Sequence, residues 1–272
     1  MNQLLTFFAV SYFISWMIWL PLYGHIFGLT NLPTVPLNHG LGGFGPLIAS
    51  FLTTWIFRKQ DGVKKLIKKC FQVRPLIYLS IAILSPFILA FVGTVIGCIL
   101  DKTPINLSGL LTYKEFPNSN LLTFFIYNLI FFGFGEEVGW RGFALPLFQD
   151  KFNALASSII LTIFWAIWHW PLFFYRPGYT SMDFTGMIGW SFSLLTGSIL
   201  LTWLFNSSRG SILICAIFHA TIDIAFTADF GGKNTMNYMG FLITIWGILT
   251  IIIFKPKSLA TNERLKSSSL KA

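Results

Sequence analysis

The chain has 272 residues, of which 54% are hydrophobic, 18% aromatic and only 11% charged, and its mean hydropathy is +0.69. Soluble domains carry roughly 25% charged residues, so this balance excludes an ordinary soluble protein and indicates that lipid is the solvent. The formal net charge of +9 could suggest a nucleic-acid partner, but the placement of the basic residues described below argues against that class of protein.

Long apolar runs follow one another along the whole chain. We predict an all-α polytopic membrane protein with about eight transmembrane helices in a single bundle, because a helix needs roughly 17–25 residues to cross a bilayer. The predicted spans are 4–27, 42–57, 76–100, 120–147, 153–174, 186–205, 211–228 and 238–254. Two of them are short, and the fourth is long enough to tilt or bend. The first lacks a basic leading region and a small-residue cleavage site, which predicts a retained anchor.

Basic residues collect on one side of the predicted bundle. Between the second and third spans lie Arg58, Lys59, Lys64, Lys65, Lys68, Lys69 and Arg74. After the last span come Lys255, Lys257, Arg264, Lys266 and Lys271. Because both clusters fall on the side that carries the two termini, positive-inside bias predicts a multi-pass cell-membrane protein with both termini in the cytoplasm. Segment 58–75 is predicted to lie along the anionic inner leaflet, the alternative being a solvated basic loop.

No stretch outside the spans is long enough to fold as a separate domain. Residues 1–257 are therefore predicted to form one membrane domain, and residues 258–272 a short, polar and disordered cytoplasmic tail. Outer loops are predicted at 101–119 and 173–185, where proline and polar residues gather. The three cysteines are few and widely spaced, so they are expected to be packing residues rather than disulfide or metal sites: Cys70, Cys98 and Cys215.

Three ionisable residues stand in one of the most apolar stretches of the chain, in the fourth span: Glu136, Glu137 and Arg141. Each charge at membrane depth costs several kcal/mol unless it is paired or solvated. Glu137 and Arg141 are i,i+4 neighbours that can pair, whereas Glu136 points about 100° away from Glu137. A buried ion pair that fixes helix register is the alternative for this pair, but it leaves Glu136 unexplained. The same helix has a small face that lets a neighbouring backbone approach closely: Gly133, Gly135, Gly139 and Gly142.

Two histidine motifs follow. Trp165 and His169 lie one turn apart in the fifth span, and His219 and Asp223 lie one turn apart in the seventh. A lone histidine on an apolar helix is usually a satisfied core residue, but antiparallel packing would bring His169 to the carboxylates of the preceding helix. The His219–Asp223 spacing is that of metal ligands on one helix face, and a structural His–Asp hydrogen bond is the alternative. The remaining histidines flank the first outer loop and are predicted to be interfacial: His25 and His39.

The motifs EExxxR, [F/W]xxxH and HxxxB, where B is Asn or Asp, thus occur in this order on three hydrophobic helices. This ordered trio resembles the CAAX prenyl protease and bacteriocin-processing family, also called Abi, whose members are intramembrane proteases. The resemblance covers about 120–228 through its motifs and the whole chain through its eight-helix plan. It implies an integral-membrane endopeptidase that hydrolyses a peptide bond of a peptide or protein substrate near the membrane surface.

The resemblance also implies roles for individual side chains. Glu136 and His169 would activate a water for attack on the scissile carbonyl, and Glu137 and Arg141 would hold their helix and orient its neighbours. The remaining pair would stabilise the oxyanion or bind a metal that does so: His219 and Asp223. One divalent metal, zinc before any other, would be held by Glu136, His169, His219 and Asp223.

Two residues depart from the usual pattern of the family. Trp165 stands in place of the more usual Phe, a change that is expected to alter packing only. Asp223 stands where many relatives have Asn, and an ionised carboxylate would repel an oxyanion. Asp223 is therefore expected to stay protonated, to bind the metal or to orient His219, the last two being preferred.

Two other classes of protein could use the same residues. A non-proteolytic membrane immunity or scaffold protein could retain the motif as a structural knot. A proton-coupled transporter also uses buried Glu, His and Asp as relay residues. The chain shows no convincing internal repeat, which weakens the transporter hypothesis.

Overall fold

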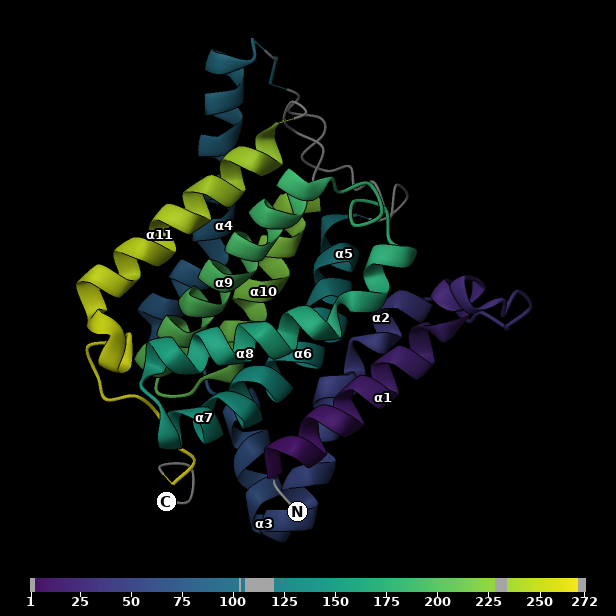
Figure 1. The fold of residues 1–272 in the computed structure, drawn as a ribbon. Coiled ribbons are helices and arrows are strands. Elements are labelled where there is room, and N and C mark those ends of the chain that lie inside the picture. Colours follow the sequence, from purple (N-terminus) through teal and green to yellow (C-terminus); the bar gives the residue numbers. More distant parts are fainter. Residues whose placement is uncertain (1–2, 103, 106–119, 228–233, 269–272) are drawn as a thin grey trace.

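The structure is a computed structural model that describes residues 3–102, 104–105, 120–227 and 234–268. Every secondary-structure element in these residues is a helix or a helical turn (Figure 1), which confirms the predicted all-α class. The α-helices are α1 Gln3–Tyr23, α2 Asn38–Gly42, α3 Phe44–Cys70, α4 Leu76–Leu100, α5 Leu121–Asn128, α6 Gly135–Gly139, α7 Leu145–Lys151, α8 Ala154–Trp168, α9 Phe184–Ser207, α10 Ile212–Thr227 and α11 Thr235–Ser258. Two 3₁₀ turns, η1 Gly24–Phe27 and η5 Trp170–Phe174, and two π-helical turns, η3 Leu129–Phe134 and η4 Trp140–Ala144, complete the order.

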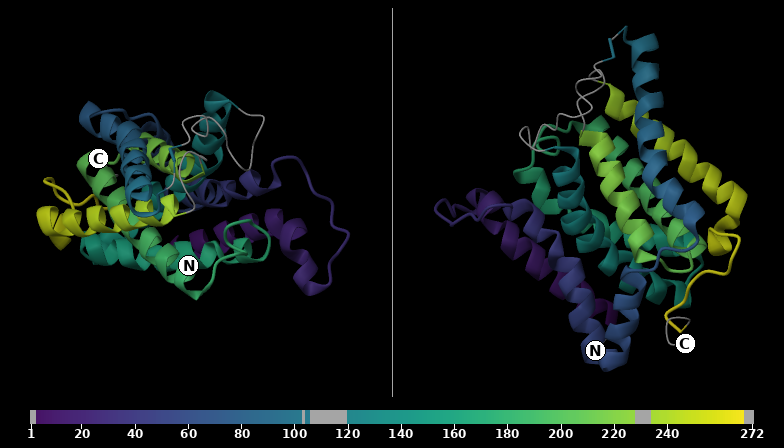
Figure 2. Two further views of the ribbon diagram at one scale, coloured as in Figure 1. Left: turned by 90° about the horizontal axis from the view of Figure 1, so that it is seen from above. Right: turned by 180° about the vertical axis from the view of Figure 1, so that it is seen from behind.

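The described residues contain seven helical stretches that are long and apolar enough to cross a membrane. They correspond to seven of the eight predicted spans, which confirms the polytopic plan. The remaining predicted span, 211–228, corresponds to α10, an apolar helix of 16 residues. This helix is slightly shorter than the roughly 17–25 residues of a typical span. It lies in the interior of the bundle, beside α4 and η3 (Figure 2). Most of the outer loop predicted at 101–119 lies outside the described residues.

The start of α1 and the segment after α11 lie at the same end of the bundle (Figure 1). This arrangement agrees with an even number of crossings. The side of the membrane on which the termini stand remains a prediction from the basic residues.

The fourth predicted span is bent in a specific way, because it is not one regular helix. It runs through α5, η3, α6, η4 and α7 without leaving the helical path. The two π-helical turns flank α6, the five-residue segment that carries Glu136 and Glu137. Turns of this kind are rare and occur frequently at functional sites. The carboxylates therefore lie on a short segment whose angular position about the helix axis differs from that of the helices before and after it.

Backbone contacts hold α6 and its flanking turns between two neighbours, α3 and α10. A Cβ atom added to Gly139 would lie 2.5 Å from Cβ and 2.7 Å from the carbonyl oxygen of Pro46 in α3. A Cβ atom added to Gly133 would lie 2.5 Å from the carbonyl oxygen of Ala216 in α10. Only glycine fits at these distances. The small face predicted for this helix is thus the face on which neighbouring backbones pack closely.

An aromatic core packs behind this segment. Trp140 is fully buried, with its ring 5.5 Å from that of Phe7 and 5.9 Å from that of Trp168. The three cysteines are free thiols, and two of them, Cys70 and Cys215, are buried, as expected for packing residues. This core fixes one wall of the site described below.

The segment after α11 packs on the bundle, so the prediction of a disordered tail is wrong for its described part, up to residue 268. Gln149 donates from Nε2 to the carbonyl oxygen of Leu265 at 2.8 Å, and Arg264 donates from Nε to the carbonyl oxygen of Gln149 at 3.0 Å. The backbone N–H of Ser267 donates to the carboxylate of Asp150 at 2.9 Å, and its hydroxyl does so at 2.5 Å. These partners lie far earlier in the sequence, so the polar composition of the tail could not reveal them.

Candidate active site

The indole of Trp165 lies at the centre of the predicted site. Its Nε1–H donates to Oε2 of Glu136 at 2.7 Å. The guanidinium carbon of Arg141 lies 4.8 Å from the centre of its ring. The rings of His169 and His219 lie 5.6 Å and 5.8 Å from it, centre to centre. One side chain of α8 therefore contacts members of all three motifs.

The expectation that Trp165 only alters packing is wrong. An indole N–H is a hydrogen-bond donor, and a phenylalanine ring of similar bulk has none. The bond to Glu136 connects α8 to α6, although α8 packs its backbone mainly against α9, α7 and α11. Family pattern alone could not show this, because it records which aromatic residue is present and not what its nitrogen meets.

Glu136 is nearly buried, with 3% of its surface exposed. A second indole, that of Trp140, donates from Nε1 to the same Oε2 atom at 3.3 Å. Within the described part of the chain no hydrogen bond to Oε1 is found. The carboxylate thus has one oxygen held by two donors and one oxygen without a protein partner among these residues.

Glu137 forms the ion pair that the sequence predicts, and it also makes a contact that the sequence does not. Arg141 donates from a terminal nitrogen to Oε1 of Glu137 at 3.2 Å, which confirms the i,i+4 pairing. His219 donates from Nδ1 to the same oxygen at 2.7 Å. The second terminal nitrogen of Arg141 donates to the hydroxyl of Ser198 at 3.1 Å. Glu137 and Arg141, both fully buried, thereby join the bent span to α9 and α10.

His169 follows the last residue of α8, and its ring is almost fully buried. Its Nδ1 lies 2.8 Å from the carbonyl oxygen of Trp165. Because a carbonyl oxygen can only accept, Nδ1 carries a proton, and in the neutral imidazole Nε2 then has the free lone pair. The ring of His169 is stacked on that of Tyr179, with 6.3 Å between centres and 10° between planes. Burial raises the pKa of Tyr179 to about 12, so this phenol stays neutral at physiological pH.

His219 and Asp223 share one face of α10, as their spacing predicts. Nε2 of His219 lies 3.6 Å from Oδ2 of Asp223, which is longer than a hydrogen bond. Asp223 sits at the rim of the site, with its side chain 34% exposed. Glu137 holds the other nitrogen of His219 at 2.7 Å and so orients this ring, and the role expected of Asp223 stays a prediction.

The two histidines share one feature with metal ligands. Both imidazoles use Nδ1 to donate to an oxygen, as histidine ligands of metals commonly do. However, no group of three His, Cys, Asp or Glu side chains that could hold a metal ion occurs anywhere in the described residues. Zinc binding by the four predicted ligands therefore stays a prediction.

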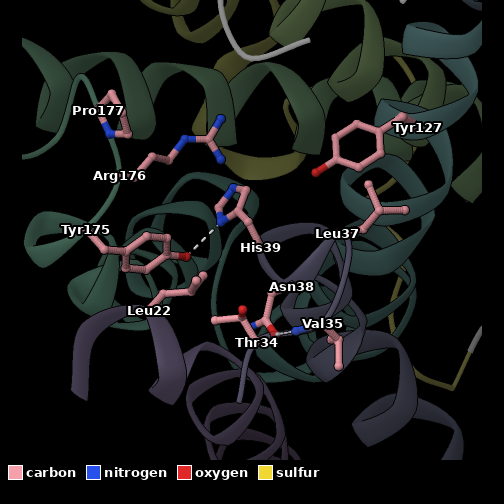
Figure 3. Close-up of a pocket in the computed structure, with 10 residues that line it drawn as sticks. All are labelled: Leu22, Thr34, Val35, Leu37, Asn38, His39, Tyr127, Tyr175, Arg176 and Pro177. Atoms are coloured by element: carbon pink, nitrogen blue, oxygen red, sulfur yellow. Dashed lines mark hydrogen bonds between the residues drawn. The ribbon is translucent and has the colours of Figure 1, made fainter. Parts of the chain in front are cut away.

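A cavity of about 490 Å³ lies beside the site, and His39 forms part of its wall (Figure 3). Nδ1 of His39 is 2.7 Å from the hydroxyl of Tyr175, and Nε2 is buried without a partner among the described residues. His39 and Arg176 are both close enough to His169 to act on it, or to be acted on, electrostatically. His39 lies in this wall, whereas His25 is exposed in η1, and the interfacial position of both histidines stays a prediction.

Three contributors to the site were missed from the sequence: Trp140, Ser198 and Tyr179. Trp140 had a local signal, because it stands one helical turn after Glu136 and so shares its face. Ser198 and Tyr179 had none. Both reach the site only through the packing of α9 and of the segment between η5 and α9.

A bundle of apolar helices that gathers three buried polar motifs defines a polytopic all-α membrane protein with an internal polar site. Residues 118–225, which contain all three motifs, match the model of a family described as "Type II CAAX prenyl endopeptidase Rce1-like". The chain is also similar to CAAX prenyl protease 2 of Methanococcus maripaludis, with 33% identity over 93 residues, 33% of this chain and 34% of that protein. The alignment thus spans about a third of that relative's length. The two matches confirm the resemblance to the CAAX prenyl protease and bacteriocin-processing family.

Replacing Glu137 by Ala is expected to destabilise the protein strongly. The change leaves the guanidinium of Arg141 buried without a carboxylate, and breaking such a pair costs about 3–5 kcal/mol. Thermal unfolding in detergent, followed by circular dichroism, measures the loss. Glu263→Ala is the matched control, because Glu263 is an exposed carboxylate. Equal unfolding temperatures for the two variants would contradict the structural role of Glu137.

Proposed function

We propose that this protein is an intramembrane endopeptidase of the CAAX-protease type, which hydrolyses a peptide bond near the membrane surface. The proposal is supported by one observation above all: Glu136, His169 and His219 surround a single indole inside the segment that matches the family. A protein that used the motif only to hold its helices together would need the Glu137–Arg141 pair. It would have no need of a second buried carboxylate, Glu136, in the same site as His169.

The first step uses two acceptors on either side of a water molecule. Oε1 of Glu136 and Nε2 of His169 each accept one hydrogen of the water, which aligns its oxygen for attack on the scissile carbonyl carbon. As the carbon–oxygen bond forms, Glu136 takes the proton. The carbonyl oxygen becomes an oxyanion, and the carbon becomes tetrahedral.

The second step needs a donor to the oxyanion and a proton for the leaving amine. His219 is fixed through Nδ1 by Glu137, so its Nε2 faces the site. With a proton on Nε2 as well, His219 donates to the oxyanion, and Asp223 at 3.6 Å balances its charge. Glu136 then passes its proton to the amine nitrogen and the carbon–nitrogen bond breaks, which releases an amine and a carboxylic acid. The acid gives its remaining proton to Nε2 of His169 and leaves as a carboxylate.

Glu136→Ala and His169→Ala are expected to abolish cleavage, because each removes one acceptor for the water. General acid–base groups contribute about 10²–10⁴-fold to the rate. The assay uses purified protein in liposomes with membrane-anchored peptides, comparing prenylated and unprenylated C-terminal tails to define the substrate. His25→Ala is the control, since this exposed histidine lies outside the site.

Retention of the wild-type elution volume and unfolding temperature by both Ala variants would show that lost cleavage is not lost folding. Cleavage by either variant at the wild-type rate would contradict the proposed roles.

The family resemblance predicts that Glu136, His169, His219 and Asp223 bind zinc, whereas the hydrolysis proposed above needs no metal. Because these side chains do not form a three-ligand set as described, we expect substoichiometric zinc in the purified protein and cleavage that survives a chelator. Elemental analysis before and after dialysis against 1,10-phenanthroline, with activity measured on the same samples, is the test. Stoichiometric zinc whose removal and return switch activity off and on would overturn this expectation.

The basic end of α3 supports a second partner, the anionic leaflet of the bilayer. The backbone of Lys59 has a φ of 56°, which interrupts α3 and redirects the segment that follows. In that segment the exposed Lys64 and Lys68 lie close in sequence to Ile67 and Phe71, which are 43% and 72% exposed. Lysines beside exposed apolar side chains suit the interface between anionic headgroups and acyl chains.

Replacing Lys64 and Lys68 together by Gln is expected to weaken binding of anionic lipid, at about 1 kcal/mol for each lysine near the surface. The measurement is the rise in unfolding temperature when phosphatidylglycerol replaces phosphatidylcholine in mixed micelles. Lys102→Gln is the control, because Lys102 is exposed after α4, at the opposite end of the bundle. An equal rise for wild type and the double variant would exclude this contact.

A further inference from the structure

We infer that Trp165, assisted by Trp140, is a positioning residue for the carboxylate of Glu136: the two indoles hold Oε2, so that Oε1 is the atom that takes the proton from water. This inference rests on the proposed hydrolysis. It adds a role for a side chain that was expected only to fill space.

Both indoles donate to the same oxygen of Glu136. Trp165 donates to Oε2 at 2.7 Å and Trp140 donates to the same atom at 3.3 Å, whereas no hydrogen bond to Oε1 is found among the described residues. A glutamate side chain has three rotatable bonds, and a single bond to one oxygen would still allow the carboxylate to swing. Two donors that approach one oxygen from different helices fix both its position and the direction of the other oxygen.

The donors themselves cannot move aside. Trp140 is fully buried, with the rings of Phe7 and Trp168 against it at 5.5 Å and 5.9 Å. Trp165 is 6% exposed, and the guanidinium of Arg141 lies over its ring at 4.8 Å. The indoles are therefore rigid supports, and the precision with which Glu136 is held comes from the core behind it.

Trp165→Phe tests the N–H donor alone. Phenylalanine has no such donor, but its aromatic ring keeps the contact with His169 and His219. Without the donor, the ionised carboxylate loses stabilisation. We expect the acidic limb of the pH–rate profile to move about one pH unit higher, a tenfold change in the ionisation equilibrium. We also expect kcat to fall while KM changes little, since Trp165 acts on the base and not on substrate binding.

The matched control is Trp168→Phe. Trp168 stands on the same helix and donates from Nε1 to the hydroxyl of Ser15 at 2.8 Å, away from Glu136. Its loss removes a buried indole bond of similar length, so it reproduces the cost to the fold. The acidic limb of its profile is expected to stay at the wild-type position.

A readout that needs no cleavage keeps the inference separate from the proposed function. The carboxyl stretch of protonated Glu136 is identified in infrared spectra by its absence from Glu136→Gln, and its titration is then followed in each variant. An upward shift of this titration in Trp165→Phe supports the inference even if the protein cleaves no peptide. Folded Trp165→Phe with an unmoved titration and an unmoved acidic limb overturns it, whatever the activity of the wild type.

Trp140→Phe provides the second test should Trp165→Phe fail to fold. Its bond to Oε2 is longer, 3.3 Å against 2.7 Å, so the same shift is expected in the same direction but smaller. An unmoved titration in Trp140→Phe, with Trp165→Phe unfolded, also counts against the inference.

Discussion

The bundle depends on one interaction, the pairing of the buried guanidinium of Arg141 with Glu137. A cation with no exposed surface in an apolar interior has to be neutralised where it stands, and the fold is built around that requirement. The pair meets it within one helix turn at 3.2 Å, and His219 and Ser198 then add bonds from two further helices. Glu136 directly precedes Glu137 in α6, so these bonds also fix its position, and its side chain points to a different side of the helix.

The sequence was a good guide to the spans, because a bilayer imposes length and apolarity directly on the chain. Seven of the eight predicted spans meet both criteria, and the eighth, Ile212–Thr227, is a little short. Features that depend on distant partners could not be predicted. The tail is held by Gln149 and Asp150, and the π-helical turns around α6 leave no mark in an apolar run, where every face is equally hydrophobic.

For the site, residue types and spacing were enough to select the three motifs, since ionisable residues are scarce in apolar helices. The connections between the motifs were beyond reach. The bond from His219 to Glu137 joins α10 to α6, and the bond from Trp165 joins α8 to α6, so each depends on how helices cross. The family pattern even misled in one place, because it treats Trp and Phe as equivalent where a single N–H distinguishes them.

The two π-helical turns have a consequence for how this protein can change over time. Each turn inserts an extra residue into the helical path, so α6 has its own angular phase, independent of α5 and α7. Mutational drift on the membrane-facing surfaces of the outer segments can then adapt to bilayers of different thickness or composition without rotating the glutamates.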